Sequence, residues 1–193
     1  GVENIHLDFF KRHLHLPNSK NSNKPSQNYW NLTSKKWQNS TQLLGSSPIW
    51  GLKSTGKACH DSKDGRLNLQ SKGSGMVVLV HDPWRPIPSI GGHLSPQPGE
   101  ANRIEIDKRP EIATFTSSPF MKTFHLEGFP TLQIKVNADQ KGFDLCVALS
   151  IINKEQTNIN QLSTGFLRVR GENANEALVR KIVLYPLIAD FEE

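Results

Sequence analysis

The sequence predicts a mainly β protein, a β-sandwich or jelly roll, with a short helix at its N-terminus. Short strand-like segments separated by Gly, Pro and Asn turns fill residues 41–193, and almost no helical period appears after residue 16. Strands that follow one another without intervening helices favour a sandwich over an α/β fold. A chain of 193 residues is long enough for one domain with a hydrophobic core.

The helix is expected over residues 5–14. Its apolar residues Ile5, Phe9, Phe10 and Leu14 fall on one face. Asn4 is a suitable N-cap, and Pro17 ends the helix. Residues 18–42 then contain no acidic residue and many Asn, Ser, Lys and Gln. We therefore expect a polar linker over residues 17–40, anchored by its aromatic side chains.

The strands are predicted from two kinds of apolar pattern. Residues 76–80 form a continuous apolar run, Met-Val-Val-Leu-Val, which is typical of a strand buried on both faces. Residues 131–137 alternate, so one face packs inward and the other meets water. An Asp64-Gly65 turn introduces another strand at 66–69. Further strands are expected at residues 42–44, 49–52, 143–151, 162–169 and 178–184.

Charge, hydropathy and cysteine spacing argue against a nucleic-acid partner, a membrane span and a metal site at the cysteines. Residues 1–72 hold 11 Lys/Arg and 4 Asp/Glu, whereas residues 73–193 hold 12 Lys/Arg and 14 Asp/Glu. The net charge of +5 therefore comes from the polar N-terminal part, and it does not indicate a nucleic-acid partner. No apolar run approaches the ~18 residues of a membrane span. Cys59 and Cys146 lie far apart with no metal-binding spacing, which favours free thiols and a cytoplasmic location.

The search for catalytic and metal-binding motifs finds none that is complete. Gly73-Ser74-Gly75 has the wrong spacing for a nucleophile elbow and leads into an expected strand. The consecutive Cys59-His60-Asp61 side chains would project to alternate sides of an extended chain, so they cannot act as a triad. The histidines show no metal-ligand spacing, and Gly91-Gly92 alone does not make a phosphate loop. We expect no catalytic residue, metal or cofactor.

The most unusual segment runs from Asp82 to Leu94. Three prolines hold it extended, and Gly91-Gly92 allows backbone angles closed to other residues. The result is a stiff loop that carries Trp84, Ile87, His93 and Leu94 outward. It is either a corner of the sandwich or a surface presented to a neighbouring domain or a ligand pocket.

Residues 82–92, Asp-Pro-Trp-Arg-Pro-Ile-Pro-Ser-Ile-Gly-Gly, resemble the loop that opens the C-terminal domain of X-Pro dipeptidyl-peptidases and cocaine-esterase-like (CocE/NonD) acyl hydrolases. Other segments resemble that family in the same order, including Phe-Phe-Lys-Arg-His-Leu at 9–14, Arg-Pro-Glu-Ile-Ala-Thr-Phe-Thr-Ser-Ser-Pro at 109–119 and Gly-Phe-Leu-Arg-Val-Arg at 165–170. The resemblance covers nearly the whole chain.

The resemblance implies a galactose-binding-like jelly roll that caps an α/β-hydrolase domain with a Ser-His-Asp triad. It implies three parts: residues 1–16 as the terminal helix of that upstream domain, 17–40 as a linker, and 41–193 as a jelly roll lacking its last strands. This chain would then be non-catalytic, with the upstream domain as its partner. The loop residues Trp84, Ile87, Gly91, Gly92, His93 and Leu94 would line the substrate pocket.

Two departures from the family pattern matter. Gly142 stands where the family has an acidic residue, and the chain stops at Glu193 where the pattern continues into further strands. We expect an open sheet edge there, covered either by association between copies or by another strand that fills the gap. Two alternatives remain open: a carbohydrate-binding module using Trp30, Trp37, Trp50 or Trp84, and a protein-interaction module.

Overall fold

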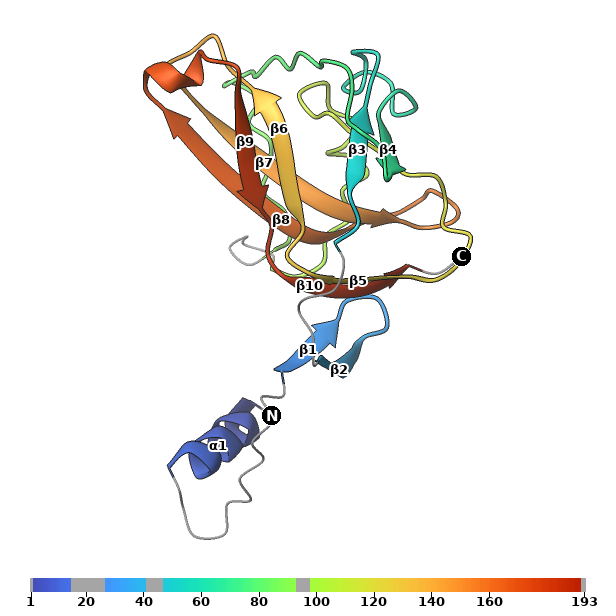
Figure 1. Ribbon diagram of the computed structural model, residues 1–193, viewed down its shortest axis with the longest axis vertical. Helices are drawn as coiled ribbons and strands as arrows, with labels where there is room; N and C mark the ends of the chain where they lie inside the picture. Colours follow the sequence, from blue (N-terminus) through green and yellow to red (C-terminus); the bar gives the residue numbers. More distant parts are fainter. Residues whose placement is uncertain (1, 15–26, 41–46, 93–97, 192–193) are drawn as a thin grey trace.

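The computed structural model describes residues 2–14, 27–40, 47–92 and 98–191 (Figure 1). The described residues form one α-helix, one 3-10 helix and ten strands, so the prediction of a mainly β fold is confirmed. The helices are α1 (Val2–His13) and η1 (Glu172–Ala174). The strands are β1 (Gln27–Asn31), β2 (Lys36–Ser40), β3 (Trp50–Lys53), β4 (Arg66–Leu69), β5 (Phe124–Gly128), β6 (Thr131–Val136), β7 (Gly142–Ile152), β8 (Ile159–Arg170), β9 (Leu178–Val183) and β10 (Leu187–Phe191).

The strands pair into one four-stranded sheet and three two-stranded ones. The larger sheet has the order β2-β1-β10-β5, and the pairs are β3 with β4, β6 with β9, and β7 with β8. The β7–β8 hairpin is the longest and contains an irregularity between Leu149 and Ser150. β10 is the centre of the larger sheet: it pairs antiparallel with β5 and meets β1 in parallel at Asn31 and Ile188.

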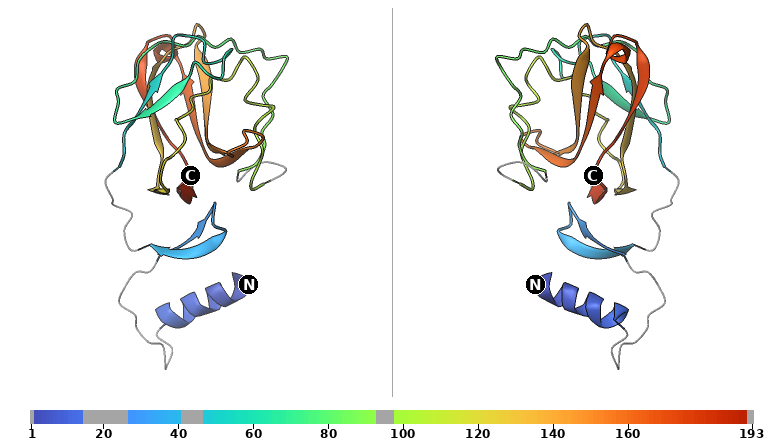
Figure 2. Two further views of the ribbon diagram at one scale, coloured as in Figure 1. Left: turned by 90° about the vertical axis from the view of Figure 1, so that its right-hand side faces the viewer. Right: turned by 90° about the vertical axis from the view of Figure 1, so that its left-hand side faces the viewer.

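The core is built on β10. The side chains of Leu187, Ala189 and Phe191 are buried, and four of the five residues of β10 are buried in all. These side chains pack against residues of β5, β7 and β8, so the sheet that contains β10 faces the long β7–β8 hairpin as in a sandwich (Figure 2). The residues that pack there are Leu32, Phe120, Phe124, Leu126, Leu149, Ile151 and Leu162. The strand connections of a jelly roll remain a prediction.

The segment expected as a polar linker contains a β-hairpin, so the expectation of loop over residues 27–40 is wrong. β1 and β2 pair along their length, and Trp30 lies opposite Trp37 with ring centroids 5.7 Å apart. The hairpin attaches to the sheet through Asn31, whose fully buried amide donates to Gln38 Oε1 at 3.1 Å and to Asp190 Oδ2 at 2.7 Å. A polar residue forms this contact, which explains why the hydrophobic pattern gave no sign of it.

Residues 76–80, expected as a buried strand, form no strand and lie at the surface. Met76, Val78 and Val80 are 77%, 67% and 75% exposed. The chain follows β3 only as far as Ser74, whose backbone bonds to Leu52 and Ser54, and then leaves it. The apolar run is therefore real, but no described element covers it.

The N-terminal helix is confirmed as α1, and its apolar side chains Phe9 and Phe10 are exposed, as is Leu14 directly after it. Figure 1 shows α1 at the far end of the molecule from β6–β9, beyond the β1–β2 hairpin. Neither α1 nor any other described helix has the length and apolar character needed to cross a membrane.

Candidate functional site

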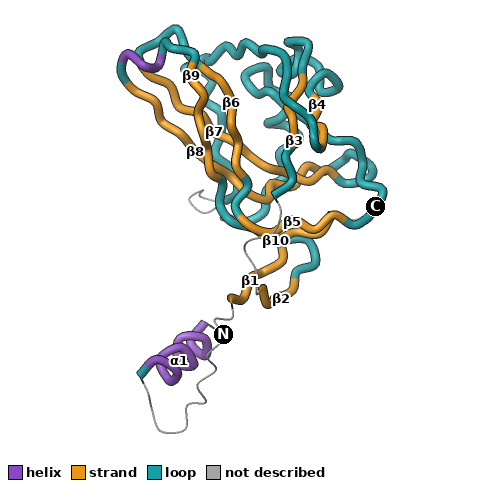
Figure 3. Tube along the Cα trace, viewed as in Figure 1, coloured by secondary structure: helices purple, strands orange, loops and turns teal. Residues whose placement is uncertain are grey.

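The candidate loop belongs to the long connection between β4 and β5. The described residues of this connection, 70–92 and 98–123, contain no helix and no strand (Figure 3). Irregular backbone of this length needs specific contacts to hold its shape. Two sets of such contacts hold the segment from Asp82 to Gly92.

The first set is centred on Arg109 and holds the start of the loop. The Arg109 guanidinium donates to the carbonyl oxygens of Arg85 and, at 3.2 Å, of Pro86. The same guanidinium pairs with the buried Glu111 carboxylate at 3.2 Å. These hydrogen bonds from Arg109 hold the pKa of Glu111 below its ordinary value. Asp82 adds a turn of its own, because its Oδ1 accepts from the Trp84 backbone N–H at 2.9 Å.

The second set holds the double glycine at the other end. Gly91 and Gly92 have φ values of +60° and +73°, in the left-handed region that favours glycine. Gly92 exchanges two backbone hydrogen bonds with Gly99, of 2.9 and 3.0 Å. A Cβ on Gly91 would lie 2.7 Å from the Gly99 carbonyl oxygen, so only glycine fits. The pair therefore has a structural role whatever ligand the loop meets.

A buried glutamine fixes this glycine turn to the sandwich. Gln161 of β8 is 6% exposed, and its Nε2 donates to the Ile90 carbonyl oxygen at 3.2 Å. Its Oε1 accepts from Arg103 Nη1 at 2.7 Å, and Arg103 in turn pairs with Asp107 at 3.1 Å. Both polar ends of the amide are thus used, and the loop is tied to a strand of the core.

Between these two anchor points the loop presents its apolar side chains to solvent. Trp84 is 93% exposed and Ile87 is also exposed. Of the other residues expected to line a pocket, Gly91 is buried and Gly92 is half-buried, while His93 and Leu94 lie outside the described residues.

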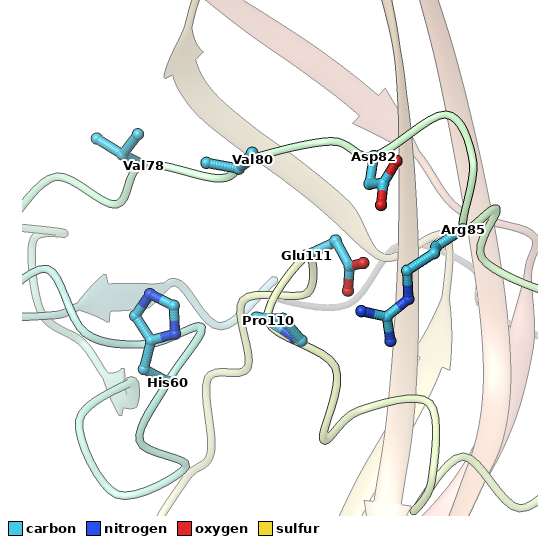
Figure 4. Close-up of a pocket in the computed structure, with 7 residues that line it drawn as sticks. All are labelled: His60, Val78, Val80, Asp82, Arg85, Pro110 and Glu111. Carbon is cyan, nitrogen blue, oxygen red and sulfur yellow. The ribbon is translucent and has the colours of Figure 1, made fainter.

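A pocket of about 220 Å³ lies under the start of the loop (Figure 4). Three stretches of chain meet there, and Figure 4 shows the Arg85 side chain directed towards Glu111. Val78, Val80 and Pro110 give the pocket apolar walls. The residues that line it are His60, Val78, Val80, Asp82, Arg85, Pro110 and Glu111, a set that includes neither Trp84 nor Ile87.

Sequence reasoning did not assign this pocket. His60 was set aside with its neighbours, and the structure agrees that the three do not act together: the Cys59 thiol faces the Val78 carbonyl, and Asp61 accepts from the Lys63 backbone. Among the other lining residues, the sequence marks only Pro110 and Glu111, which lie in the segment 109–119 that resembles the family. The pocket offers binding, with no nucleophile and base arranged for catalysis among its lining residues.

The arrangement closest to a catalytic dyad lies elsewhere, on β5 and β10. His125 Nδ1 is 2.6 Å from Asp190 Oδ1, which raises the pKa of His125 and lowers that of Asp190. The other ring nitrogen faces Glu127 Oε2 at 3.3 Å, where a triad would place a nucleophile. Within the described ranges no group of three or more His, Cys, Asp or Glu side chains is placed to bind a metal.

Comparison with known proteins identifies the family of the chain. No curated protein matches the chain significantly. The crystal structure of a CocE/NonD family hydrolase from Staphylococcus aureus is similar over the whole chain, with 15% sequence identity and a TM-score of 0.55, and this chain covers 36% of that one. The family model described as the X-Pro dipeptidyl-peptidase C-terminal non-catalytic domain matches residues 18–189. The chain belongs to that family, the non-catalytic C-terminal domains of X-Pro dipeptidyl-peptidases.

Proposed function

We propose that this domain forms one wall of the substrate pocket of a serine hydrolase, an acyl esterase or an X-Pro dipeptidyl-peptidase, whose Ser-His-Asp triad lies on an upstream α/β-hydrolase domain. α1 is then the last helix of that domain. The exposed apolar face of α1 supports this division, because apolar helix faces are normally packed against a neighbour.

The observation that carries the proposal is the exposure of Trp84 on a loop fixed at both ends. The Arg109 contacts and the Gln161 contacts fix the backbone, so little conformational entropy is lost when a ligand or domain packs on the loop. A large exposed indole on a rigid loop favours contact with a partner over a role in the domain's own core. Wall residues of this kind supply binding and exclude water, and the triad supplies the chemistry.

Activity assays test the proposal in two steps. The chain by itself should not hydrolyse nitrophenyl esters or Xaa-Pro nitroanilides, and turnover that Ser74→Ala abolishes would contradict the non-catalytic role. In the protein that also carries the catalytic domain, Trp84→Ala should lower kcat/KM by about tenfold, as loss of ~1.5 kcal/mol of apolar contact predicts. The control is Trp37→Ala on the distant hairpin. Unchanged kcat/KM for Trp84→Ala with every substrate would exclude the pocket-wall role.

We also propose that copies of the chain associate through an open sheet edge and that the protein works in the cytoplasm. Free thiols at Cys59 and Cys146 support the cytoplasmic location. The open edge through which copies would associate is not β10, since β10 has a neighbouring strand on both sides. The outer strands of that sheet are β2 and β5.

Carbohydrate binding is a second candidate function, favoured by another pocket of about 220 Å³ beside Trp50. The pocket carries no charged side chain, and its polar residues Asn68, Ser117 and Ser118 suit a neutral hydroxylated ligand. Edge contacts with Phe120 and Phe124 orient the Trp50 ring. Titration of the chain with monosaccharides and oligosaccharides, followed by tryptophan fluorescence, tests this; a signal that survives Trp50→Phe would contradict it.

A further inference from the structure

The pocket under the start of the loop contains two side chains of opposite charge that form no ion pair with a described residue, Asp82 and Arg85. Asp82 Oδ1 accepts from the Trp84 backbone N–H, and within the described part of the chain Asp82 Oδ2 has no hydrogen-bond donor. Figure 4 shows the Asp82 carboxylate and the Arg85 side chain both directed towards the space around Glu111. The pocket therefore offers a ligand one negative and one positive group.

A turn holds these two charged residues close together. The Arg85 backbone N–H donates to the Asp82 carbonyl oxygen at 3.1 Å, which closes a four-residue turn. Such a turn brings its first and last Cα atoms within about 7 Å of each other. Pro83 occupies the second position, where its fixed φ suits the turn. Arg109 holds the Arg85 carbonyl oxygen as well. Because the protein's own contacts fix this backbone, less entropy is lost when a ligand binds to it.

The other carboxylate of the pocket, Glu111, is already used by the protein. Both of its oxygens accept from the Arg109 guanidinium, at 3.2 and 3.3 Å. These hydrogen bonds lower the pKa of Glu111, and the nearby positive charge of Arg85 adds to the effect. Two guanidinium groups thus balance two carboxylates in and around the pocket, counting Asp82. A ligand with no net charge matches this balance, whereas a simple anion or cation does not.

The rest of the pocket is largely apolar, and the pocket is small. Val78, Val80 and Pro110 form its walls, and Figure 4 places His60 at the opposite end from Arg85. Its volume of about 220 Å³ lies below the range of about 300–1,000 Å³ found for sites that hold drug-sized ligands. A matching ligand therefore carries an aliphatic group of only a few carbon atoms beside its charges.

We infer that this pocket binds a free α-amino acid with an aliphatic side chain, such as leucine or valine. The ligand carboxylate pairs with the guanidinium of Arg85, whose planar fork suits a carboxylate. The ligand ammonium group donates to Asp82 Oδ2, and the aliphatic side chain packs against Val78, Val80 and Pro110. A single carbon atom separates the two charged groups of an amino acid, which suits binding groups held on one turn. A carboxylic acid without the ammonium group would leave Asp82 uncompensated, and an amine would leave Arg85 so.

The inference goes beyond the proposed pocket-wall role and does not rest on it. The wall role is carried by Trp84, which does not line this pocket. Amino-acid binding is measured on the chain by itself, whereas the wall role is measured as kcat/KM in the protein with its catalytic domain. Leucine binding together with unchanged kcat/KM in Trp84→Ala would contradict the wall role alone. Lowered kcat/KM in Trp84→Ala without leucine binding would contradict the amino-acid site alone.

The test is a titration of the purified chain with leucine, followed by the amide chemical shifts of the protein in NMR spectra. We expect a Kd of about 1 mM, in keeping with so small a ligand. Two analogues separate the charges, since isocaproate lacks the ammonium group of leucine and isoamylamine lacks its carboxylate. Each should bind at least about tenfold more weakly than leucine. Glycine, which has no aliphatic side chain, should also bind at least about tenfold more weakly.

Two variants assign the two charges to their residues. Arg85→Gln should weaken leucine binding at least about tenfold and leave isoamylamine binding unchanged. Asp82→Asn keeps the acceptor for the Trp84 N–H, and it should weaken leucine binding but not isocaproate binding. Arg66→Gln and Asp139→Asn, the same changes at exposed positions outside the pocket, are the matched controls and should bind leucine as the wild type does.

Three outcomes would overturn the inference. One is the absence of leucine-dependent shifts, or leucine binding that both pocket variants leave unchanged. Another is equal affinity for leucine and isocaproate, because the ammonium group would then have no partner. The third is tighter binding of the dipeptide leucylproline than of leucine, since the charged ends of the dipeptide lie farther apart.

Discussion

Replacing Gln161 with methionine tests whether this single side chain holds the loop to the sandwich. Methionine fills nearly the same volume but can neither donate to the Ile90 carbonyl nor accept from Arg103. Because Gln161 is 6% exposed, water cannot take over either bond without a local rearrangement. The change therefore removes hydrogen bonds while largely preserving packing.

The expected cost follows from the two bonds. Loss of a hydrogen bond to a charged guanidinium costs about 1.5–3 kcal/mol, and an unpaired carbonyl costs about 1–3 kcal/mol. Asp107 still pairs with Arg103, and Ile90 is only half-buried, so both values fall in the lower part of their ranges. We expect Gln161→Met to lower the free energy of unfolding by about 2–4 kcal/mol.

Urea unfolding measures this cost. With a denaturant slope of about 2 kcal/mol per M, the midpoint should fall by roughly 1–2 M. Gln133→Met on β6 is the control, since Gln133 is exposed and should change stability by less than about 0.5 kcal/mol. Gln161→Glu should regain stability as the pH falls and its carboxyl group becomes a donor to Ile90. Equal midpoints for the two methionine variants would refute the reasoning.

Three further predictions concern other contacts. Asn31→Ala should lower the free energy of unfolding by about 2–3 kcal/mol. It should also remove amide hydrogen-exchange protection from the β1–β2 hairpin, while protection of β7–β8 persists. Protection retained in both hairpins would contradict this prediction. Hydrogen bonds from Ser54 and Thr55 lower the pKa of Asp64 from 3.8 to about 2. The wild-type protein should therefore lose stability as the pH falls through that interval. In acid titrations of stability, Asp64→Asn should not show this loss. The Asp190 contact raises the pKa of His125 above 6.5, so its stabilising effect is complete below pH 6.5 and is lost as the pH rises through the raised pKa. His125→Gln should therefore differ most from wild type at low pH, and a difference independent of pH would rule out this linkage.

The strands found from the sequence are those with strong local patterns. The Asp64-Gly65 turn located β4, the alternation at 131–137 located β6, and short segments rich in apolar residues between turns located β7, β8 and β9. The sequence did not locate β5 and β10, whose pairing joins residues about sixty positions apart along the chain. β10 is buried on both of its faces, so its sequence has no alternation to detect.

The candidate site divides in a similar way. Prolines and glycines indicated a stiff loop at 82–94, because their backbone limits are properties of single residues. The contacts that hold this loop come from Arg109 and Gln161, and no local pattern marks a glutamine in β8 as an anchor. Nothing in the sequence indicated which neighbours would meet His60 and Arg85 in the pocket.

The sequence by itself determined the mainly β class, the N-terminal helix, the absence of a complete catalytic motif and the family resemblance, since these depend on residue types and short spacings. Only the tertiary structure decided that the polar segment at 27–40 is a hairpin and that the apolar run at 76–80 is uncovered. Both outcomes depend on which distant residues come into contact. Asn31 meets Asp190, so a polar residue is buried, whereas Val78 meets no covering strand in the described chain, so an apolar one stays exposed.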